Sequence, residues 1–317
     1  MLFGFDLPLR GPLATADTMT RIANEAEAMG FGYATISDHV IFPATINARY
    51  PYSETGAFPN MGAGDVYDQL TAIAFLSART KKLRFLTSVM VVPHRPAVQT
   101  AKVIATIDVL SGGRITIGCG AGWLREEFEA IGAPPFDQRG EATNEYLAAF
   151  KELWTQESPR FAGKHVKFDN ILFAPKPTQK PHPPLWVGGE SNPALRRAAK
   201  LGDGWYPIGT NPQFPVDTLA RYKGHVARLH AMLKEEGRDL KTFTLGYRCA
   251  VPWGGEAAKA SDGERRLFTG DAATIAADIR AMRDLGVSSL DFRMAAPTLD
   301  GMLGNMQRFR DEVMAKV

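Results

Sequence analysis

Short apolar stretches alternate with helical patterns along the whole chain, and this alternation constrains the fold more than any other feature of the sequence. A glycine follows most of the helical patterns, as expected where a helix ends in the left-handed conformation. The predicted strands are Leu2–Phe5, Tyr33–Ile36, Leu83–Val89, Arg114–Ile117, Leu185–Val187, Trp205–Ile208, Phe243–Cys249 and Ser289–Met294. The predicted helices are Ala16–Met29, Tyr67–Ala78, Pro96–Leu110, Glu141–Trp154, Pro193–Leu201, Pro215–Glu236 and Ala272–Leu285.

Strands that alternate with helices pair in parallel through right-handed crossovers, and eight such units close naturally into a barrel. The sequence therefore predicts an α/β fold, a (βα)8 TIM barrel. An open doubly wound sheet is the alternative, but its G-x-G-x-x-G fingerprint is missing after the first strand, where Gly4 and Gly11 are isolated. No shift in composition indicates a linker, so we expect residues 1–317 to form a single domain.

Two segments are too long for the connections of a minimal barrel. Residues 40–64 are rich in proline, glycine and aromatic side chains, and residues 161–184 contain five prolines and the pattern of a hairpin. Long ordered segments of this kind are typically lids or binding loops. We expect both insertions to lie at the C-terminal mouth of the barrel.

Composition excludes several classes of function. The formal net charge is only +3, from 37 basic and 34 acidic residues without long blocks of one sign, so a nucleic-acid partner is not indicated. Cys119 and Cys249 are too few for a disulfide framework, and no residues have zinc-ligand spacing. The N-terminus lacks a signal-peptide pattern and no apolar run is long enough to span a membrane, so we expect a cytoplasmic protein without a metal.

The pair Asp38-His39 follows the second predicted strand directly and is the strongest indication of chemistry. Polar residues just past the carboxyl end of a parallel strand line the mouth of a barrel. Histidine has an ordinary pKa near neutrality and suits general acid–base catalysis, and a neighbouring carboxylate can orient the ring. A structural role for the pair is the alternative, and metal ligation is a weaker one because no further ligands complete a site.

Two glycine-rich turns come next. Gly188-Gly189 leads through Glu190 and Ser191 into a helix that has Pro193 in its first turn, so free backbone N–H groups and a hydroxyl are available to a phosphate. Ser191 or Asn192 acting only as a helix cap is the alternative. In the second turn, Gly118, Gly120 and Gly122 precede Trp123. The glycines would let a flat ligand approach the backbone closely, with Trp123 forming one wall of the pocket. The alternative is that the glycines only allow a tight turn and bind no ligand. Cys119 lacks the neighbouring histidine that a nucleophile requires.

Further polar residues stand at predicted strand ends: Asp6, Ser88, His94-Arg95, Arg248 and Arg293. Arginines at a barrel mouth suit an anionic substrate or the anionic tail of a cofactor.

Together these motifs resemble the bacterial luciferase-like superfamily of flavin- and deazaflavin-dependent oxidoreductases. The resemblance covers nearly the whole chain. It is carried by the N-terminal strand, Ser37-Asp38-His39, Thr87-Ser88-Val89, Leu110–Arg114, Gly122–Phe128, Phe136–Glu141, Gly188-Gly189 and Gly202-Asp203-Gly204-Trp205. Several ordered motifs at compatible spacing are more specific than any one of them.

The resemblance implies a redox ring at the C-terminal mouth, with a non-prolyl cis peptide at Ser88-Val89 against the middle of the ring. It also implies that the cofactor phosphate lies on Gly189, Glu190 and Ser191. The cofactor-binding residues expected on this basis are Asp38, His39, Ser88, Val89, Gly120, Gly189, Glu190, Ser191 and Trp205.

The Asp38-His39 step after the second strand resembles the branch that uses the deazaflavin coenzyme F-420, whereas many FMN monooxygenases have a Glu-His-His pattern at the corresponding position. Deazaflavin sugar-phosphate dehydrogenases carry a glutamate acid where this chain has Trp123, which argues against a sugar-phosphate substrate. The predicted function is hydride transfer between F-420 and a small organic substrate that is held against Phe42, Tyr50, Phe58, Met90 and Trp123. His39 would move the proton, and Asp38 would orient His39.

The alternative is an FMNH2-dependent monooxygenase that uses O2 and a partner flavin reductase. A non-catalytic flavin-binding protein and a metal-dependent hydrolase on the same barrel are weaker hypotheses. Barrels of this family are often dimeric, so a homodimer is expected.

Overall fold

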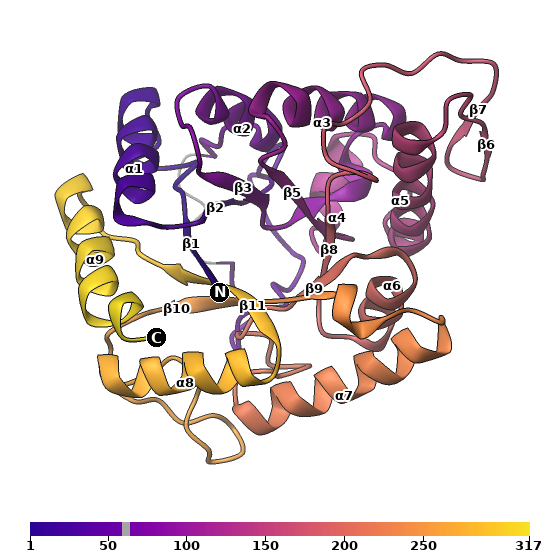
Figure 1. The fold of residues 1–317 in the computed structure, drawn as a ribbon. Coiled ribbons are helices and arrows are strands. Elements are labelled where there is room, and N and C mark those ends of the chain that lie inside the picture. Colours follow the sequence, from indigo (N-terminus) through magenta and orange to yellow (C-terminus); the bar gives the residue numbers. More distant parts are fainter. Residues whose placement is uncertain (59–63) are drawn as a thin grey trace.

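All eight predicted strands form, and they pair side by side in parallel into a closed barrel (Figure 1). The structure is a computed structural model that describes residues 1–58 and 64–317. The ring closes because β3 pairs with β5 at one side and β1 pairs with β11 at the other. Its strands are β1 (Leu2–Asp6), β2 (Tyr33–Ile36), β3 (Arg84–Thr87), β5 (Ile115–Gly120), β8 (Leu185–Gly188), β9 (Gly204–Tyr206), β10 (Thr244–Pro252) and β11 (Val287–Arg293). The predicted TIM barrel is confirmed.

The third strand is interrupted. Its predicted range, Leu83–Val89, splits at Ser88-Val89, where the peptide bond is cis, and the chain continues as β4 (Met90–Val91) along the end of β5. A cis peptide at this position is what the family resemblance implies.

Helices connect the strands on the outside of the barrel (Figure 1). The α-helices are α1 (Ala16–Met29), α2 (Gln69–Ser77), α3 (Ala97–Ser111), α4 (Arg125–Ala130), α5 (Arg139–Thr155), α6 (Asn192–Leu201), α7 (Leu219–Glu235), α8 (Ala272–Asp284) and α9 (Leu299–Glu312). Single 3-10 turns occur at Val92–His94, Phe136–Gln138, Leu240–Thr242 and Met314–Lys316. Two of these helices, α4 and α9, were not expected from the sequence.

Most of the predicted glycine terminators have the expected conformation. Gly30 and Gly112 have φ of 90° and 68° and end α1 and α3, because a left-handed residue there lets the chain turn away. Gly202 after α6 differs, since its φ is −84°. A Cβ atom at Gly202 would lie 3.0 Å from both the Ala198 carbonyl oxygen and the Val187 side chain, so close approach to β8 requires this glycine.

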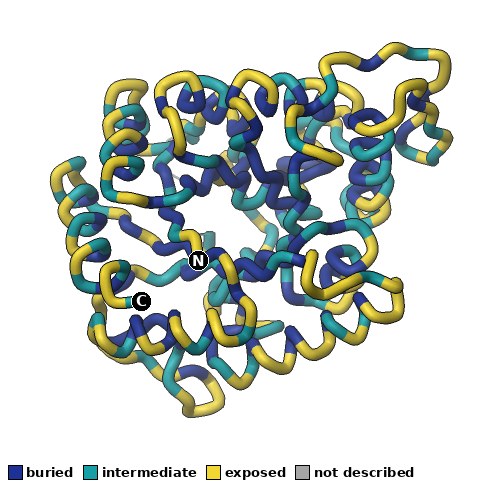
Figure 2. Tube along the Cα trace, in the orientation of Figure 1, coloured by how far each residue is buried: buried dark blue, intermediate teal, exposed yellow. Residues whose placement is uncertain are grey.

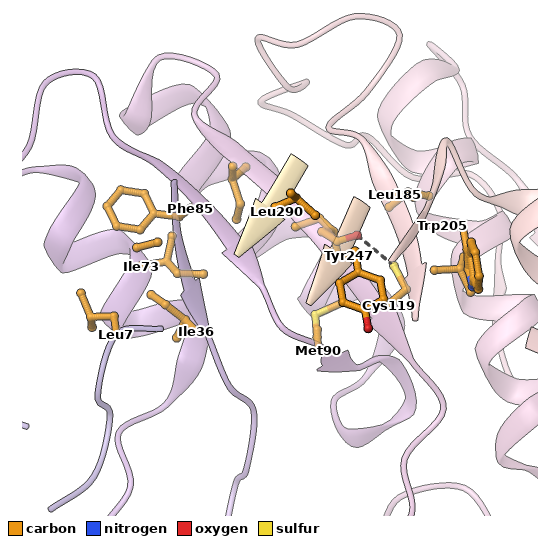
Figure 3. Close-up of a cluster of buried hydrophobic side chains, with 14 of the residues drawn as sticks. Leu7, Ile36, Ile73, Phe85, Met90, Cys119, Leu185, Trp205, Tyr247 and Leu290 are labelled. Carbon is orange, nitrogen blue, oxygen red and sulfur yellow. Dashed lines mark hydrogen bonds between the residues drawn. The ribbon is translucent and has the colours of Figure 1, made fainter. Parts of the chain in front are cut away.

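The main apolar core lies between the strands and the helices, and Figure 2 shows it as a buried inner layer under an exposed rim. In Figure 3, Ile36 of β2 and Phe85 of β3 lie beside Ile73 of α2. A second, smaller cluster contains Tyr33, Leu86 and Tyr206. Side chains alternate between the two faces of a strand, so Phe85 faces the helices while Leu86 faces the barrel interior.

The two insertions lie at opposite ends of the barrel. The first packs over the C-terminal strand ends, as predicted; its residues 59–63 lie outside the described residues. The second contains the predicted hairpin, with strands β6 (Phe161–Ala162) and β7 (Lys167–Phe168), but it does not lie at the mouth. Gln179 binds the Arg84 side chain and the Ile115 carbonyl, which mark the N-terminal ends of β3 and β5. The predicted location of residues 161–184 is therefore wrong, because this segment follows a helix, and a helix returns the chain to the N-terminal face.

Candidate active site

A cavity of about 1110 Å³ opens at the C-terminal ends of the strands. Every strand of the ring contributes to its wall, and all but β10 do so at or just beyond their ends. The contributing residues are Asp6, Asp38, Ser88, Gly120, Gly188, Tyr206, Arg248 and Arg293. A cavity at this end of the barrel is the default location of an active site in this architecture.

His39 lies in this cavity and is held by Glu127 of α4. The His39 Nδ1 and the Glu127 Oε2 atoms are 2.9 Å apart. The other oxygen, Oε1, accepts hydrogen bonds from the backbone N–H groups of Val40 and Ile41, at 2.7 and 3.3 Å. One buried carboxylate therefore fixes both the ring of His39 and the chain that follows it.

The environment of Glu127 keeps it ionised. Burial raises the pKa of Glu127, but the hydrogen bond and charge of His39 outweigh this and leave the pKa below its ordinary value. His94 lies on the other side, with its Nδ1 3.9 Å from the Glu127 Oε1. Burial lowers the pKa of His94, so His94 is mainly neutral at pH 7. Both histidines line the cavity, but only His39 lies at hydrogen-bond distance from Glu127.

Asp38 does not orient His39. Its buried carboxylate binds Arg95 through two hydrogen bonds of 2.8 and 3.0 Å and accepts a third, of 2.9 Å, from the Val91 N–H group. The predicted Asp38–His39 interaction is wrong, because adjacent residues beyond a strand point in different directions and Glu127 reaches the imidazole instead. Asp38 holds the chain just beyond the cis peptide bond.

Ser88 begins a chain of polar contacts across the barrel interior. Its Oγ atom lies 3.1 Å from the Tyr206 hydroxyl, which lies 2.5 Å from Oδ1 of Asp291. Arg248 donates to the other oxygen of Asp291 at 2.9 Å. Burial raises the pKa of Asp291 to about 6. The network joins residues of β9, β10 and β11 to Ser88, which follows β3, and it forms the floor of the cavity.

Val89 fills the space that three glycines leave. A Cβ atom at Gly120 would lie 2.5 Å from the Val89 side chain, and a Cβ atom at Gly188 would lie 3.0 Å from it. At Gly118 the added atom would meet the Thr87 carbonyl oxygen at 2.0 Å. The steric interpretation of the glycine-rich turn is therefore correct at Gly118, and Gly120 and Gly188 let Val89 sit at the centre of the cavity wall.

The turn from β8 into α6 has the features expected of a phosphate site. Gly189 has a φ of 97°, and Ser191 is the N-cap residue of α6, but its side chain makes no capping hydrogen bond. The N–H groups of the first turn and the Ser191 hydroxyl thus face the cavity. Trp205 is fully buried and donates its indole N–H to the Gly189 carbonyl oxygen at 2.9 Å. Trp205 supports the turn and does not line the cavity.

Two arginines add positive charge beside this turn. Arg139 and Arg197 both line the cavity and are close enough for their charges to interact. Arg139 donates to the carbonyl oxygens of Gly122 and Phe136, and Arg197 donates to Asn144 and to the Gly140 carbonyl oxygen. These bonds hold both guanidinium groups in place without neutralising either charge.

Glu190 points away from the helix terminus. It accepts hydrogen bonds from the Ile208 N–H group at 2.8 Å and from the Asn211 amide at 2.7 Å. Burial raises the pKa of Glu190 to about 7. Through these two hydrogen bonds, the Glu190 carboxylate links the turn before α6 to the segment after β9.

The first insertion supplies an aromatic wall opposite the floor. Phe42 lies 4.4 Å from the His39 ring, and Phe58 lies 5.6 Å from it, measured between centroids. Tyr50 and Phe58 both pack on Trp123, at 5.0 and 5.4 Å. Four of the five predicted wall residues thus line the cavity; Met90 is buried in the core instead (Figure 3).

Glu126 of α4 anchors this insertion from outside. Its Oε1 atom accepts hydrogen bonds from the N–H groups of Asn47 and Ala48, at 2.7 and 3.1 Å. The neighbouring glutamates 126 and 127 therefore bind two separate parts of the segment that covers His39.

Other chemistry has little support in the described part of the chain. No group of three or more metal-ligating side chains occurs there. Cys119 is fully buried, and burial raises the pKa of its thiol, so it is not a nucleophile. Among the described residues, no helix is both long and apolar enough to cross a membrane.

Sequence reasoning missed Glu127, Tyr206 and Asp291. Glu127 belongs to a motif on which the family resemblance depends, but its distance of 88 residues from His39 gave no sign of contact. Alternation along the predicted strands could have placed Asp291 inside the barrel, since an acidic residue in a buried strand needs a partner.

Comparison with known proteins agrees with this geometry. The family model described as luciferase-like monooxygenase matches residues 2–269. An FMNH2-dependent dimethylsulfone monooxygenase of Pseudomonas putida is 34% identical over 189 residues, which cover 57% of this chain and 52% of that protein. An uncharacterized protein of Mycobacterium tuberculosis is 29% identical over 304 residues, covering 93% of this chain and 94% of the other.

Solved structures support the fold. A coenzyme F420-dependent tetrahydromethanopterin reductase from Methanopyrus kandleri superposes with a TM-score of 0.75 at 17% identity, covering 99% of this chain and 98% of the other. With the family model matching more than half of the chain, the protein belongs to the luciferase-like monooxygenase family of oxidoreductases.

Proposed function

We propose that this protein transfers a hydride between the deazaflavin coenzyme F-420 and a small organic substrate. The observation that carries the proposal is the position of His39, which Glu127 holds at 2.9 Å in the cavity between the Ser88-Val89 wall and the aromatic insertion. A histidine with one nitrogen bound to a carboxylate and its ring exposed to a cavity is suited to proton transfer.

The residues present fit such a coenzyme at its phosphate end. Ser191 offers an uncapped hydroxyl at the N-terminus of α6, and Arg139 and Arg197 line the same part of the cavity. Anions are stabilised at helix N-termini by the free N–H groups and the helix dipole, and guanidinium groups add charge-assisted bonds. We assign the phosphate to Gly189, Ser191, Arg139 and Arg197.

The residues also fit a flat ring. Val89 projects from the cis peptide at the centre of the wall, with small residues Gly120 and Gly188 around it. When bound, the coenzyme supplies a ring carbon that accepts or donates a hydride. Asp38 and Ser88 act from behind this wall, through the Val91 N–H group and the Tyr206 hydroxyl.

In this mechanism His39 donates a proton to, or removes one from, the substrate oxygen or carbon beside it. Glu127 stabilises the protonated imidazole and keeps its Nδ1 bonded, so that the other ring nitrogen carries the exchangeable proton. Phe42, Phe58, Tyr50 and Trp123 exclude water and bind the apolar part of the substrate.

An FMNH2-dependent monooxygenase is the second candidate. The observation in its favour is the 34% identity to the dimethylsulfone monooxygenase, which is named for this cofactor. On this alternative a flavin reductase would supply the reduced cofactor, and oxygen would be consumed in proportion to product. The cytoplasmic location and the homodimer stay predictions in either case.

A titration separates the two candidates. The purified protein is titrated with F-420 and with FMN, each oxidised and reduced, and binding is followed by fluorescence quenching. Micromolar or tighter binding of F-420 with weak binding of FMN supports the deazaflavin proposal. Selective binding of reduced FMN contradicts it and supports the monooxygenase.

A further inference from the structure

Three arginines gather on the side of the cavity away from the phosphate site. Arg10 follows β1, Arg248 lies in β10 and Arg293 ends β11, and all three line the cavity. In the ring of strands, β1 stands four places from β8, which leads into α6. The strands of Arg293 and Arg248, β11 and β10, stand three and two places from β8. The cavity therefore has a second positive region, which the phosphate site does not account for.

The three guanidinium groups face a common space beside Tyr50. Their charges all act on the Tyr50 hydroxyl, and the charge of Arg293 acts on Arg10. Arg10 also lies over the rings of Phe42 and Phe58, at 5.6 and 5.2 Å from their centroids. The arginine cluster is thus continuous with the aromatic wall that surrounds His39.

Nearby carboxylates neutralise only part of this charge. Asp291 forms an ion pair with Arg248 at 2.9 Å, and Asp6 is the second carboxylate of this region, where its Oδ1 atom accepts from the Met294 N–H group. Within the described residues, no carboxylate lies at ion-pair distance from Arg293, which is exposed to the cavity. Arg293 is therefore the guanidinium group of this cluster whose charge is open to an anionic group of a ligand.

We infer that Arg10, Arg248 and Arg293 form a subsite for one carboxylate or sulfonate group of the substrate. The apolar body of the substrate then lies along Phe42 and Phe58 and presents its reactive atom to His39. This inference rests on the proposed function, because it takes the cavity to be the site of an oxidoreductase. It narrows the substrate class from small apolar compounds to apolar acids.

A matched set of aromatic probes tests the subsite. Phenylacetate and phenylmethanesulfonate carry the anionic group, whereas phenethyl alcohol and phenethylamine have a similar body with a neutral or positive group. Isothermal titration calorimetry gives the Kd of each probe for the wild type, Arg293→Gln, Arg293→Lys and Arg283→Gln. Arg283 is an exposed arginine in the last turn of α8, so its variant removes the same charge far from the cavity.

We expect both acids to bind about tenfold more tightly than the alcohol, and Arg293→Gln to remove about tenfold in affinity for the acids only. Arg293→Lys should restore most of this loss, and Arg283→Gln should have no effect. Equal affinity for the acid, alcohol and amine probes would overturn the inference, as would equal effects of Arg293→Gln and Arg283→Gln.

Titration of the same variants with F-420 and FMN identifies the source of the anion. Cofactor affinity that is unchanged in Arg293→Gln supports a substrate subsite. A variant that weakens F-420 but not the acids shows that the cluster holds the cofactor tail, and overturns the inference. Acid binding that depends on Arg293 in a protein that binds neither cofactor would leave the subsite standing and reject the proposed function.

Discussion

The Nδ1 atom of His39 lies 2.9 Å from the Oε2 atom of Glu127, although 88 residues separate them in the sequence. His39 follows β2 and Glu127 lies in α4, which follows β5, so the barrel brings the two residues together at its mouth. This pair, and not the adjacent Asp38, determines the orientation of the imidazole.

Glu127→Gln tests the pair directly. The glutamine keeps an oxygen for the Val40 and Ile41 N–H groups but removes the negative charge beside His39, so the imidazolium loses stabilisation. We expect kcat to fall about tenfold. His39→Ala should lower kcat by about 100-fold or more while leaving cofactor affinity intact.

The control for this pair is Glu129→Gln, an exposed residue of the same helix. It should leave kcat unchanged. Wild-type rates in His39→Ala would refute its role in proton transfer, and a wild-type kcat in Glu127→Gln would refute the coupling.

Asp38→Ala should act on stability. The substitution leaves Arg95 without the carboxylate that binds two of its N–H groups, and it leaves the Val91 N–H group unsatisfied. Breaking a buried pair of this kind costs about 3 kcal/mol in free energy of unfolding. Urea denaturation measures the change. Asp137→Ala, which breaks the exposed pair with Arg125, is the matched comparison and should have little effect; equal losses in the two variants would contradict the prediction.

Glu126→Ala should loosen the first insertion without changing the barrel. The hydrogen bonds to the Asn47 and Ala48 N–H groups disappear, so these amides should exchange with solvent faster. Hydrogen exchange followed by mass spectrometry reports on this segment, and KM should rise because the aromatic wall is less ordered. Unchanged exchange in peptides that cover residues 45–50 would show that other contacts hold the insertion.

Glu190 should make stability depend on pH. Burial raises its pKa from about 4.5 to about 7, so the folded state binds a proton that the unfolded state releases in this range. Its contribution to stability is therefore fully present below pH 4.5 and is lost as the pH rises through 7, by at most about 1.4 kcal/mol per pH unit. Urea denaturation between pH 5 and pH 8 should show a shallower decline in Glu190→Gln than in the wild type. Parallel curves would contradict the assignment.

Arg197→Gln should weaken cofactor binding through the phosphate. The variant removes one of the two guanidinium groups near the N-terminus of α6, so we expect the Kd for F-420 to rise about tenfold. The phosphate-free deazaflavin, which has the same ring, should bind equally to both proteins. A similar loss for the phosphate-free deazaflavin would place Arg197 at the ring and not at the phosphate.

The barrel could be predicted from the sequence because its eight strands and the helices between them are local patterns. These patterns depend on apolar spacing and on helix terminators such as Gly30 and Gly112. The sequence also predicted that Gly189 and Ser191 lie at the cavity, since residues at the ends of parallel strands all meet at one face. The family resemblance added Ser88 and Val89, and the aromatic content of the first insertion indicated Phe58.

Side-chain partners depended on the tertiary structure. Because Asp38 and His39 are adjacent in the chain, Asp38 was expected to orient His39. Their side chains leave the strand end in different directions, so His39 pairs with Glu127 and Asp38 binds Arg95. Trp205 was predicted at the cofactor and lies behind the Gly189 turn, because its position in β9 points outwards to the helices. The second insertion went to the opposite face because it follows a helix and not a strand.

The sequence by itself thus determined the order of the elements and the face of the barrel on which chemistry occurs. Only the tertiary structure decided which charges meet: Glu127 with His39, Asp291 with Arg248, and Arg10 with Arg293. The physical reason is that strand and helix patterns arise from interactions between residues a few positions apart. Contacts between residues 43 to 283 positions apart, as in these three pairs, exist only once the barrel has closed.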